Sequence, residues 1–342
     1  MPEIPLIAQA QRHAQSIAFR GTTPTTYQEL LDRSAAIASA LLQKQSDLNE
    51  ARIALLAPAG PAYVAAQWGI WRAGGIKVPI CLTATEPEWE YALTDSGVSA
   101  VIADASSVSK ISPLCQKLGI RLLSLDEKFS TTSTLPALAT SRRAMILYTS
   151  GTTSKPKGVV TTHAQLTAQI QSLIQAWEWQ ASDVIPLFLP MHHIHGIINV
   201  TSCALWAGAT IEPFSKFDQP AILARVQAKA YSLFMAVPTI YVKLIQFLEE
   251  ASPELRTATV AGFAHMRLMV SGSAALPASV HETWTKLTGQ KLLERYGMTE
   301  IGMAISNPLR GERRPGAVGQ ALPQVEIRLR TETGDIVTAE NT

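Results

Sequence analysis

The sequence is most informative at Ala144-Met145-Ile146-Leu147-Tyr148-Thr149-Ser150-Gly151-Thr152-Thr153-Ser154-Lys155-Pro156-Lys157-Gly158. The first five residues predict a buried strand, and the rest predict a loop of hydroxyls, glycines and lysines. Glycine lets backbone N–H groups approach a ligand closely, hydroxyls donate hydrogen bonds and lysine supplies charge, so this loop suits a polyphosphate. It lacks the Gly-Lys-Ser/Thr ending of the Walker loop. The alternative interpretation is a polar surface loop that follows a strand.

The composition excludes several classes of protein. A chain of 342 residues with 47% hydrophobic residues can form two packed units. A net charge of +2, with 16% charged residues, provides no broad basic surface for nucleic acid. The three cysteines, Cys81, Cys115 and Cys203, are scattered, which favours reduced thiols over a disulfide framework or a zinc site. Without an apolar run of membrane-spanning length or a targeting signal at the N-terminus, we expect a cytoplasmic protein.

The first half of the chain alternates helix and strand patterns. Residues 26–29, Thr-Tyr-Gln-Glu, are typical of a capping box at the start of a helix. The elements expected after it are a strand at 52–56, a helix at 62–73, a strand at 76–80, a helix at 86–96 and a strand at 100–103. This order indicates a parallel sheet that is covered by helices.

The second half continues this alternation after a Ser/Thr-rich surface loop at 130–141. Its expected elements are a helix at 164–177, a strand at 184–189, a helix at 197–206 and strands near 233–237 and 268–270. From Gly319 onwards the pattern changes, because residues 325–329 alternate apolar and charged side chains and a turn follows at 332–335. This change predicts the start of an antiparallel β unit.

The glycine- and hydroxyl-rich loop resembles a known motif. Tyr-Thr-Ser-Gly-Thr-Thr-x-x-Pro-Lys-Gly is similar to the phosphate loop of the adenylate-forming superfamily, which includes acyl-CoA synthetases, firefly luciferase and peptide-synthetase adenylation domains. The superfamily usually has Gly where this chain has Ser154, a change that we expect to stiffen the loop. The resemblance implies that ATP is bound by Thr149, Ser150, Gly151, Thr152, Thr153 and Lys157.

A second motif follows at residues 293–300, Leu-Glu-Arg-Tyr-Gly-Met-Thr-Glu. It resembles the superfamily's Tyr-Gly-x-Thr-Glu, which implies that Tyr296 stacks on adenine, Thr299 contacts the α-phosphate and Glu300 holds Mg²⁺. Both contacts suit the chemistry of an aromatic face and a carboxylate. The alternative is a strand, a glycine turn and a helix cap. The resemblance adds further nucleotide contacts at Glu294, Arg295, Gly297 and Met298, and at Ser273 and Ala274 in the small-residue turn 271–275.

Three histidines lie within residues 190–196, Pro-Met-His-His-Ile-His-Gly. This segment matches the superfamily's Pro-x-x-His-x-x-Gly, with His193 in the histidine position. A metal site is another possibility, but no cysteine or acidic residue lies nearby to complete one. We therefore expect His193 to line the acid pocket with His195 beside it. Plain packing or hydrogen bonding by these side chains is the alternative.

Arg295 bears most directly on the substrate. A dicarboxylate brings a second negative charge into a closed pocket, and a guanidinium can pair with it through two hydrogen bonds. An Arg directly before Tyr-Gly-Met-Thr-Glu resembles the malonyl-CoA synthetases, and the similarity extends through residues 234–241, 267–277 and 311–319. The predicted acid-binding residues are His193, His195, Arg295 and Ser271. The alternative for Arg295 is a surface salt bridge with Glu294.

These observations predict an α/β protein with two Rossmann-like subdomains, whose parallel-rich sheets are covered by helices. Residues 1–180 form the first, residues 181–317 the second, and residues 318–342 begin a small β-barrel. Asp335 is expected to be an ordinary turn residue rather than the superfamily's ribose-binding Asp. The superfamily's C-terminal domain with its catalytic lysine is therefore expected to be absent from the chain.

The predicted function is the ligation of malonate or methylmalonate to coenzyme A. In that reaction ATP and Mg²⁺ first give an acyl-adenylate, and the products are the acyl-CoA, AMP and diphosphate. The predicted catalytic residues are Lys157, Thr299, Glu300 and His193. Two other functions stay open, a ligase for a different carboxylic acid and a nucleotide-binding module that is catalytically incomplete.

Overall fold

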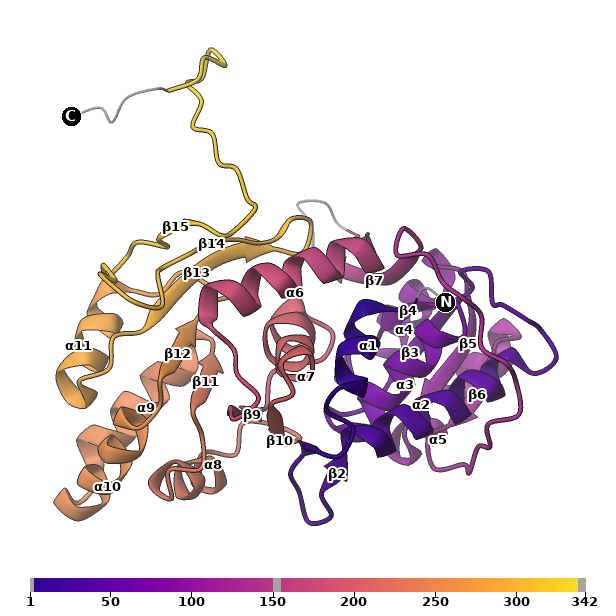
Figure 1. Cartoon of the computed structure of the whole chain (residues 1–342), viewed down its shortest axis with the longest axis horizontal. Coiled ribbons are helices and arrows are strands. Elements are labelled where there is room, and N and C mark those ends of the chain that lie inside the picture. Colours follow the sequence, from indigo (N-terminus) through magenta and orange to yellow (C-terminus); the bar gives the residue numbers. More distant parts are fainter. Residues whose placement is uncertain (1–2, 150–154, 338–342) are drawn as a thin grey trace.

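The computed structural model describes residues 3–149 and 155–337. Three sheets and their covering helices make an α/β protein with parallel-rich sheets, as the sequence predicts (Figure 1). Most of the apolar core is one continuous cluster, which includes Trp68, Trp177 and Trp284. No described helix combines the length and the hydrophobicity that crossing a membrane requires.

The first sheet has six strands in the order β6-β5-β3-β4-β7-β8 and is parallel except for the antiparallel pair β7–β8. Its strands are β3 (Arg52–Leu56), β4 (Ile76–Pro79), β5 (Val98–Ala103), β6 (Arg121–Ser124), β7 (Arg143–Thr149) and β8 (Lys157–Thr162). Its helices are α2 (Tyr27–Leu42), α3 (Pro61–Arg72), α4 (Glu86–Asp95) and α5 (Ala105–Leu118). The predicted capping box is confirmed, because Thr26 and Glu29 bond to each other's backbone N–H groups.

The second sheet has four strands in the order β2-β1-β10-β9. Its strands are β1 (Ile17–Phe19), β2 (Thr25–Thr26), β9 (Val184–Leu187) and β10 (Thr210–Pro213), and the helices around it are α1 (Pro5–Gln11), α6 (His163–Trp177), η1 (His195–Ser202) and α7 (Cys203–Ala207). Phe19 of β1 pairs in parallel with Ile211 of β10. This pair joins a segment before residue 180 to a segment after it. The subdomain border expected at residue 180 stays a prediction.

The third sheet has five strands in the order β11-β12-β13-β14-β15. Its strands are β11 (Leu233–Ala236), β12 (Leu268–Ser271), β13 (Leu293–Met298), β14 (Gly302–Ser306) and β15 (Gln320–Ala321), and its helices are α8 (Gln219–Gln227), α9 (Pro238–Glu250), α10 (Pro253–Ala264) and α11 (Ala278–Thr288). The strands from β11 to β13 are parallel, and β14 and β15 join antiparallel.

Two predictions about secondary structure need correction. The helix expected at 197–206 is a π-helix, η1, that continues into α7. Gly196 at its start lies against the carbonyl oxygens of Leu189 and Pro190, where a Cβ would collide. The strand expected at 325–329 is absent: Val325 packs against the core, but Leu329 is 68% exposed. The turn after it is confirmed by an antiparallel bridge between Arg330 and Ile336.

Candidate active site

A cavity of about 790 Å³ opens where parallel strands of all three sheets end. β7 contributes Thr149, and the segments after β9, β11 and β12 contribute Phe188, Val237 and Ser273. Ligand sites of open α/β sheets occupy this position, at the carboxyl ends of the strands. Its lining residues are Thr149, Lys157, Phe188, Leu189, Pro190, His193, Ile194, His195, Phe217, Val237, Ile240, Ser273, Arg295, Gly297, Met298, Thr299 and Glu300.

One side of the cavity is built around a serine hydroxyl. Arg295 Nη2 donates a hydrogen bond to Ser273 Oγ at 3.2 Å, and His195 Nδ1 lies 3.0 Å from the same oxygen. Arg295 is 5% exposed and His195 is 3% exposed. Arg295 Nε and His195 Nε2 have no hydrogen-bond partner among the described residues. A buried guanidinium therefore faces the cavity with part of its hydrogen-bonding capacity unused.

The turn after β12 makes room for this guanidinium. A Cβ on Gly272 would collide with the head group of Arg295, so any larger residue at this position would displace the guanidinium. Ser273 follows with φ of 70°, in the left-handed region that residues other than glycine rarely adopt. This backbone holds its hydroxyl between Arg295 and His195, so the small-residue turn seen in the sequence has a packing reason.

Glu294 points away from Arg295. Successive residues of a strand face opposite sides of the sheet, and Glu294 Oε1 accepts the N–H of Gly316 at 3.1 Å. Burial raises the pKa of this carboxyl group. The alternative of a surface salt bridge between Arg295 and Glu294 is therefore wrong, because Arg295 is buried and the two side chains have different partners.

The charge states at this end of the cavity follow from burial. Burial lowers the pKa of Arg295 to about 10, which leaves it charged at pH 7. Burial, together with the charge of Arg295, holds the pKa of His195 well below its ordinary value. Burial also lowers the pKa of His193, and burial followed by the proximity of His193 lowers that of His192 to about 4. These three imidazoles are neutral at pH 7, so Arg295 supplies the positive charge on this side.

The other side of the cavity carries the phosphate-loop residues that the structure describes. Thr149 ends β7 and Lys157 begins β8, and the two are paired across the antiparallel ladder. Thr299 and the exposed Glu300 lie in the turn between β13 and β14. Ser150, Gly151, Thr152 and Thr153 were also predicted to bind ATP, and they lie outside the described residues.

Four predicted site residues do not line this cavity, namely Ser271, Ala274, Glu294 and Tyr296. Ser271 is buried in β12 with register partner Glu294. Tyr296 is 47% exposed. Their roles in binding acid or nucleotide stay predictions.

The apolar wall of the cavity was missed by the sequence analysis. Phe188 packs edge-on against Phe217, with ring centroids 5.1 Å apart, and Val237 and Ile240 complete the wall. Phe188 and Val237 directly follow β9 and β11, Phe217 lies between β10 and α8, and Ile240 lies in the first turn of α9. Phe188 and Val237 lie at the ends of strands predicted at 184–189 and 233–237, which was the available signal, but such apolar residues look like ordinary core in a sequence.

The described residues contain no group of three His, Cys, Asp or Glu side chains that could hold a metal ion. His192 and His193 stack with ring centroids 4.3 Å apart, while His195 turns to Ser273. His192 and His193 therefore contact each other, whereas His195 has Ser273 as its hydrogen-bond partner.

The family match, the similar curated proteins and the similar solved structures agree with one another. Residues 6–342 match the family described as AMP-binding enzyme. The chain is 41% identical to the mitochondrial malonate–CoA ligase of Mus musculus over 325 residues, which cover 90% of this chain and 56% of that protein. It therefore spans about half the length of the curated relatives it matches.

Two solved structures are similar over almost the whole chain. ATP-bound MatB from Rhodopseudomonas palustris has a TM-score of 0.86 and 30% identity, covering 99% of this chain and 68% of that one. A malonyl-CoA ligase in a ternary product complex with methylmalonyl-CoA and AMP has a TM-score of 0.82 and 29% identity, covering 94% and 66%.

Proposed function

The chain belongs to the AMP-binding enzyme family, and from this premise we propose that it is the nucleotide- and acid-binding part of an AMP-forming ligase that joins malonate or methylmalonate to coenzyme A. The names of the relatives support this proposal, since the mouse protein is a malonate–CoA ligase and one solved neighbour holds methylmalonyl-CoA and AMP.

The observation that carries the proposal is the state of Arg295. No carboxylate within residues 3–149 or 155–337 pairs with it, although it is buried and charged at pH 7. A buried charge without a counterion is costly, and an anionic ligand removes that cost. The distal carboxylate of malonate would receive hydrogen bonds from Arg295 and Ser273. A monocarboxylic acid has no group to offer there.

The reacting carboxylate would then lie towards His193 and the phosphate-binding residues. In the first step it attacks the α-phosphorus of ATP, which releases diphosphate and forms the acyl-adenylate. In the second step the thiol of coenzyme A displaces AMP. Lys157, Thr149 and Thr299 would orient the phosphates and stabilise the negative charge that develops on them. A neutral His193 can exchange a hydrogen bond with the acid without adding charge.

The residues present fit a magnesium ion at the nucleotide end. Mg²⁺ commonly uses one or two carboxylates and completes its octahedron with phosphates and water. Glu300 is exposed at the cavity and supplies such a carboxylate. The ion would neutralise phosphate charge when bound. The predicted cytoplasmic location stays a proposal, because the name of the mouse relative places that protein in mitochondria.

Nucleotide binding tests the first half of the proposal. MgATP and AMP are titrated into the chain by calorimetry, with wild type and Lys157→Ala compared. We expect both nucleotides to bind, and Lys157→Ala to weaken ATP more than AMP because Lys157 is proposed to contact the phosphates. The absence of binding at millimolar nucleotide would refute the proposal.

Acid specificity tests the second half. Malonyl- and butyryl-sulfamoyl adenosine, stable mimics of the two acyl-adenylates, are titrated into wild type and Arg295→Ala. The substitution should weaken the binding free energy of the malonyl compound by about 3–5 kcal/mol, since its carboxylate loses a buried charged partner. The butyryl compound should lose little. Equal losses of affinity for both compounds would contradict the preference for malonate and favour a ligase for a different carboxylic acid.

A further inference from the structure

Helix α4 forms hydrogen bonds with Tyr148 and Pro156, the residues directly before Thr149 and Lys157. None of its own residues lines the large cavity. On the entry side, the Tyr148 hydroxyl donates to Asp95 Oδ2 at 2.7 Å. On the exit side, the Tyr91 hydroxyl donates to the carbonyl oxygen of Pro156 at 2.9 Å. One short helix face thus holds the residue before Thr149 and the residue before Lys157.

The two tyrosines also contact each other. Their ring centroids lie 6.0 Å apart with an interplanar angle of 70°, an edge-on arrangement that aromatic pairs favour. Lys155 Nζ lies 5.8 Å from the centroid of the Tyr91 ring, within the range of a cation–π interaction. Tyr91 therefore contacts the loop through its hydroxyl, its ring face and its neighbour Tyr148.

These contacts are not needed to keep α4 in place. Trp89 and Leu93 of the helix are buried in the core, at 7% and 1% exposure. Trp89 also donates from its indole N–H to the carbonyl oxygen of Cys81 at 2.9 Å. Tyr91 is half-buried and Asp95 is exposed, so both can change while the helix keeps its apolar anchors.

We propose that Tyr91 and Asp95 are positioning residues for Thr149 and Lys157: they hold the paired ends of β7 and β8 against α4, so that both side chains reach the polyphosphate of the nucleotide. The proposal rests on the function proposed above. Its physical basis is that side chains carried by a backbone that is already held in place lose less conformational entropy when they bind a ligand. Triphosphate binding, which uses Lys157, should depend on it more than AMP binding.

The experiment uses two variants and two matched controls. Tyr91→Phe removes the bond to Pro156 and keeps the ring, and Asp95→Leu removes the acceptor for Tyr148. Asp95→Asn keeps an acceptor oxygen and should rescue. Tyr27→Phe removes another tyrosine hydroxyl, which donates to Ala209 at 2.7 Å far from the loop. Hydrogen exchange of peptides covering residues 149–158 reports the loop directly, and calorimetry reports ATP and AMP affinities.

We expect Tyr91→Phe and Asp95→Leu to accelerate exchange in that segment and to weaken MgATP about three- to tenfold, the usual effect of one lost hydrogen bond. AMP affinity should change less than twofold, and Asp95→Asn and Tyr27→Phe should preserve both exchange and the ATP-to-AMP ratio. Unchanged exchange would overturn the proposal, as would equal losses of ATP and AMP. If wild type binds no nucleotide, the function proposed above fails, while the exchange measurement still decides whether α4 anchors the loop.

Discussion

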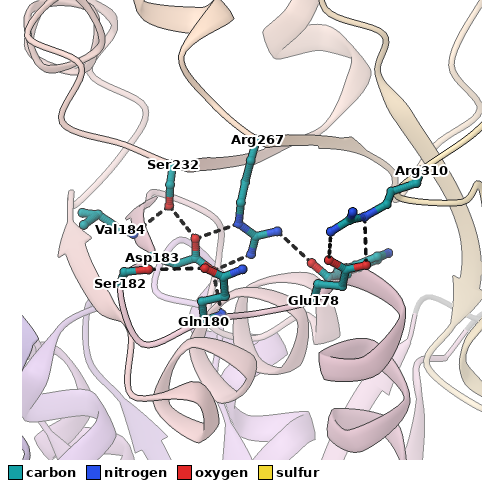
Figure 2. Close-up of polar contacts among 9 residues, drawn as sticks. Glu178, Gln180, Ser182, Asp183, Val184, Ser232, Arg267 and Arg310 are labelled. Carbon is teal, nitrogen blue, oxygen red and sulfur yellow. Dashed lines mark hydrogen bonds and ion pairs between the residues drawn. The ribbon is translucent and has the colours of Figure 1, made fainter.

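Two arginines lie at opposite ends of β12 and differ in every other respect. Arg267 comes directly before the strand and belongs to a polar cluster that Figure 2 shows. Its Nε donates to Asp183 Oδ1 at 2.8 Å, its Nη2 forms an ion pair with Asp183, and its Nη1 donates to the carbonyl oxygen of Trp177. Arg295 lies beside the turn that follows the strand, without a carboxylate partner among the described residues.

The acid of the first cluster is equally well partnered. Asp183 is 2% exposed, and besides Arg267 it accepts hydrogen bonds from Ser232 Oγ at 2.7 Å and the N–H of Gln180 at 2.8 Å. The cluster ties together the starts of β9, β11 and β12 (Figure 2). Removing one partner of such a buried pair leaves an uncompensated charge, whereas Arg295 is a buried charge that already lacks an anion within the described residues.

The largest expected effect is on the paired cluster. Asp183→Ala should lower the free energy of unfolding by about 3–5 kcal/mol, because it leaves Arg267 and Ser232 without their buried acceptor. Chemical denaturation measures this loss. Binding of malonyl-sulfamoyl adenosine should stay within twofold of wild type under conditions where the variant is folded. A large loss of that affinity would mean that the two ends of the sheet do not have separate roles.

His163 is a buried group that responds to burial by losing its charge, so it tests how burial without a counterion affects stability. His163 begins α6 and packs edge-on against Trp71, with ring centroids 5.5 Å apart, and burial lowers its pKa to about 4. The unfolded chain then binds more protons than the folded one between pH 6.5 and 4. The contribution of His163 to stability is therefore fully present above pH 6.5 and is lost as the pH falls towards 4.

His163→Phe should flatten this dependence. Wild type should lose about 2 kcal/mol through this group on going from pH 7 to pH 5, and the variant should lose correspondingly less. Denaturant unfolding of both proteins at the two pH values gives the comparison. Identical losses in the two proteins would show that His163 does not titrate as its burial requires.

The sequence was sufficient to predict the strands β3, β4, β5, β7, β9, β11 and β12 and the cavity's polar residues, because strand patterns and loop composition are local signals. Thr149, Lys157, His193, His195, Arg295, Thr299 and Glu300 all line the one cavity. Pairings between distant segments were beyond such reasoning. The parallel pairing of Phe19 with Ile211, and the carbonyl of Pro156 bonded to Tyr91, join residues that no local pattern connects.

The strand predicted at 325–329 is wrong although its local pattern is that of a strand. Its alternation was correct as a local signal, but Ile327 and Leu329 stay 45% and 68% exposed. A strand needs a neighbour that satisfies its backbone and covers its apolar face. Val325 packs on the core and Val337 donates to the carbonyl oxygen of Leu329, but no strand of the described residues pairs with 325–329. The helix predicted at 197–206 is present as η1 and α7, and only the π form of its first part was not predicted.

The unpaired arginine should respond to substitution in the opposite sense to the paired cluster. Arg295→Met replaces a buried charge by an apolar side chain of similar length, so the free energy of unfolding should stay equal or rise by about 1 kcal/mol in the absence of ligand. Denaturation of the two proteins measures it. Destabilisation on the scale expected for Asp183→Ala would mean that Arg295 has a structural partner, and the argument for an anionic ligand would fail.

The smallest effect belongs to a pair that lies beside the Arg267 cluster in Figure 2. Arg310 and Glu178 form an ion pair, but their side chains are 81% and 42% exposed. Water screens such charges, and ordering two long side chains opposes the attraction. Arg310→Gln should therefore leave the denaturation midpoint within experimental error, at low and at high salt alike. A clear loss at low salt that disappears at high salt would show that distance to a counterion matters more than burial, and the contrast between Arg267 and Arg295 would then need another cause.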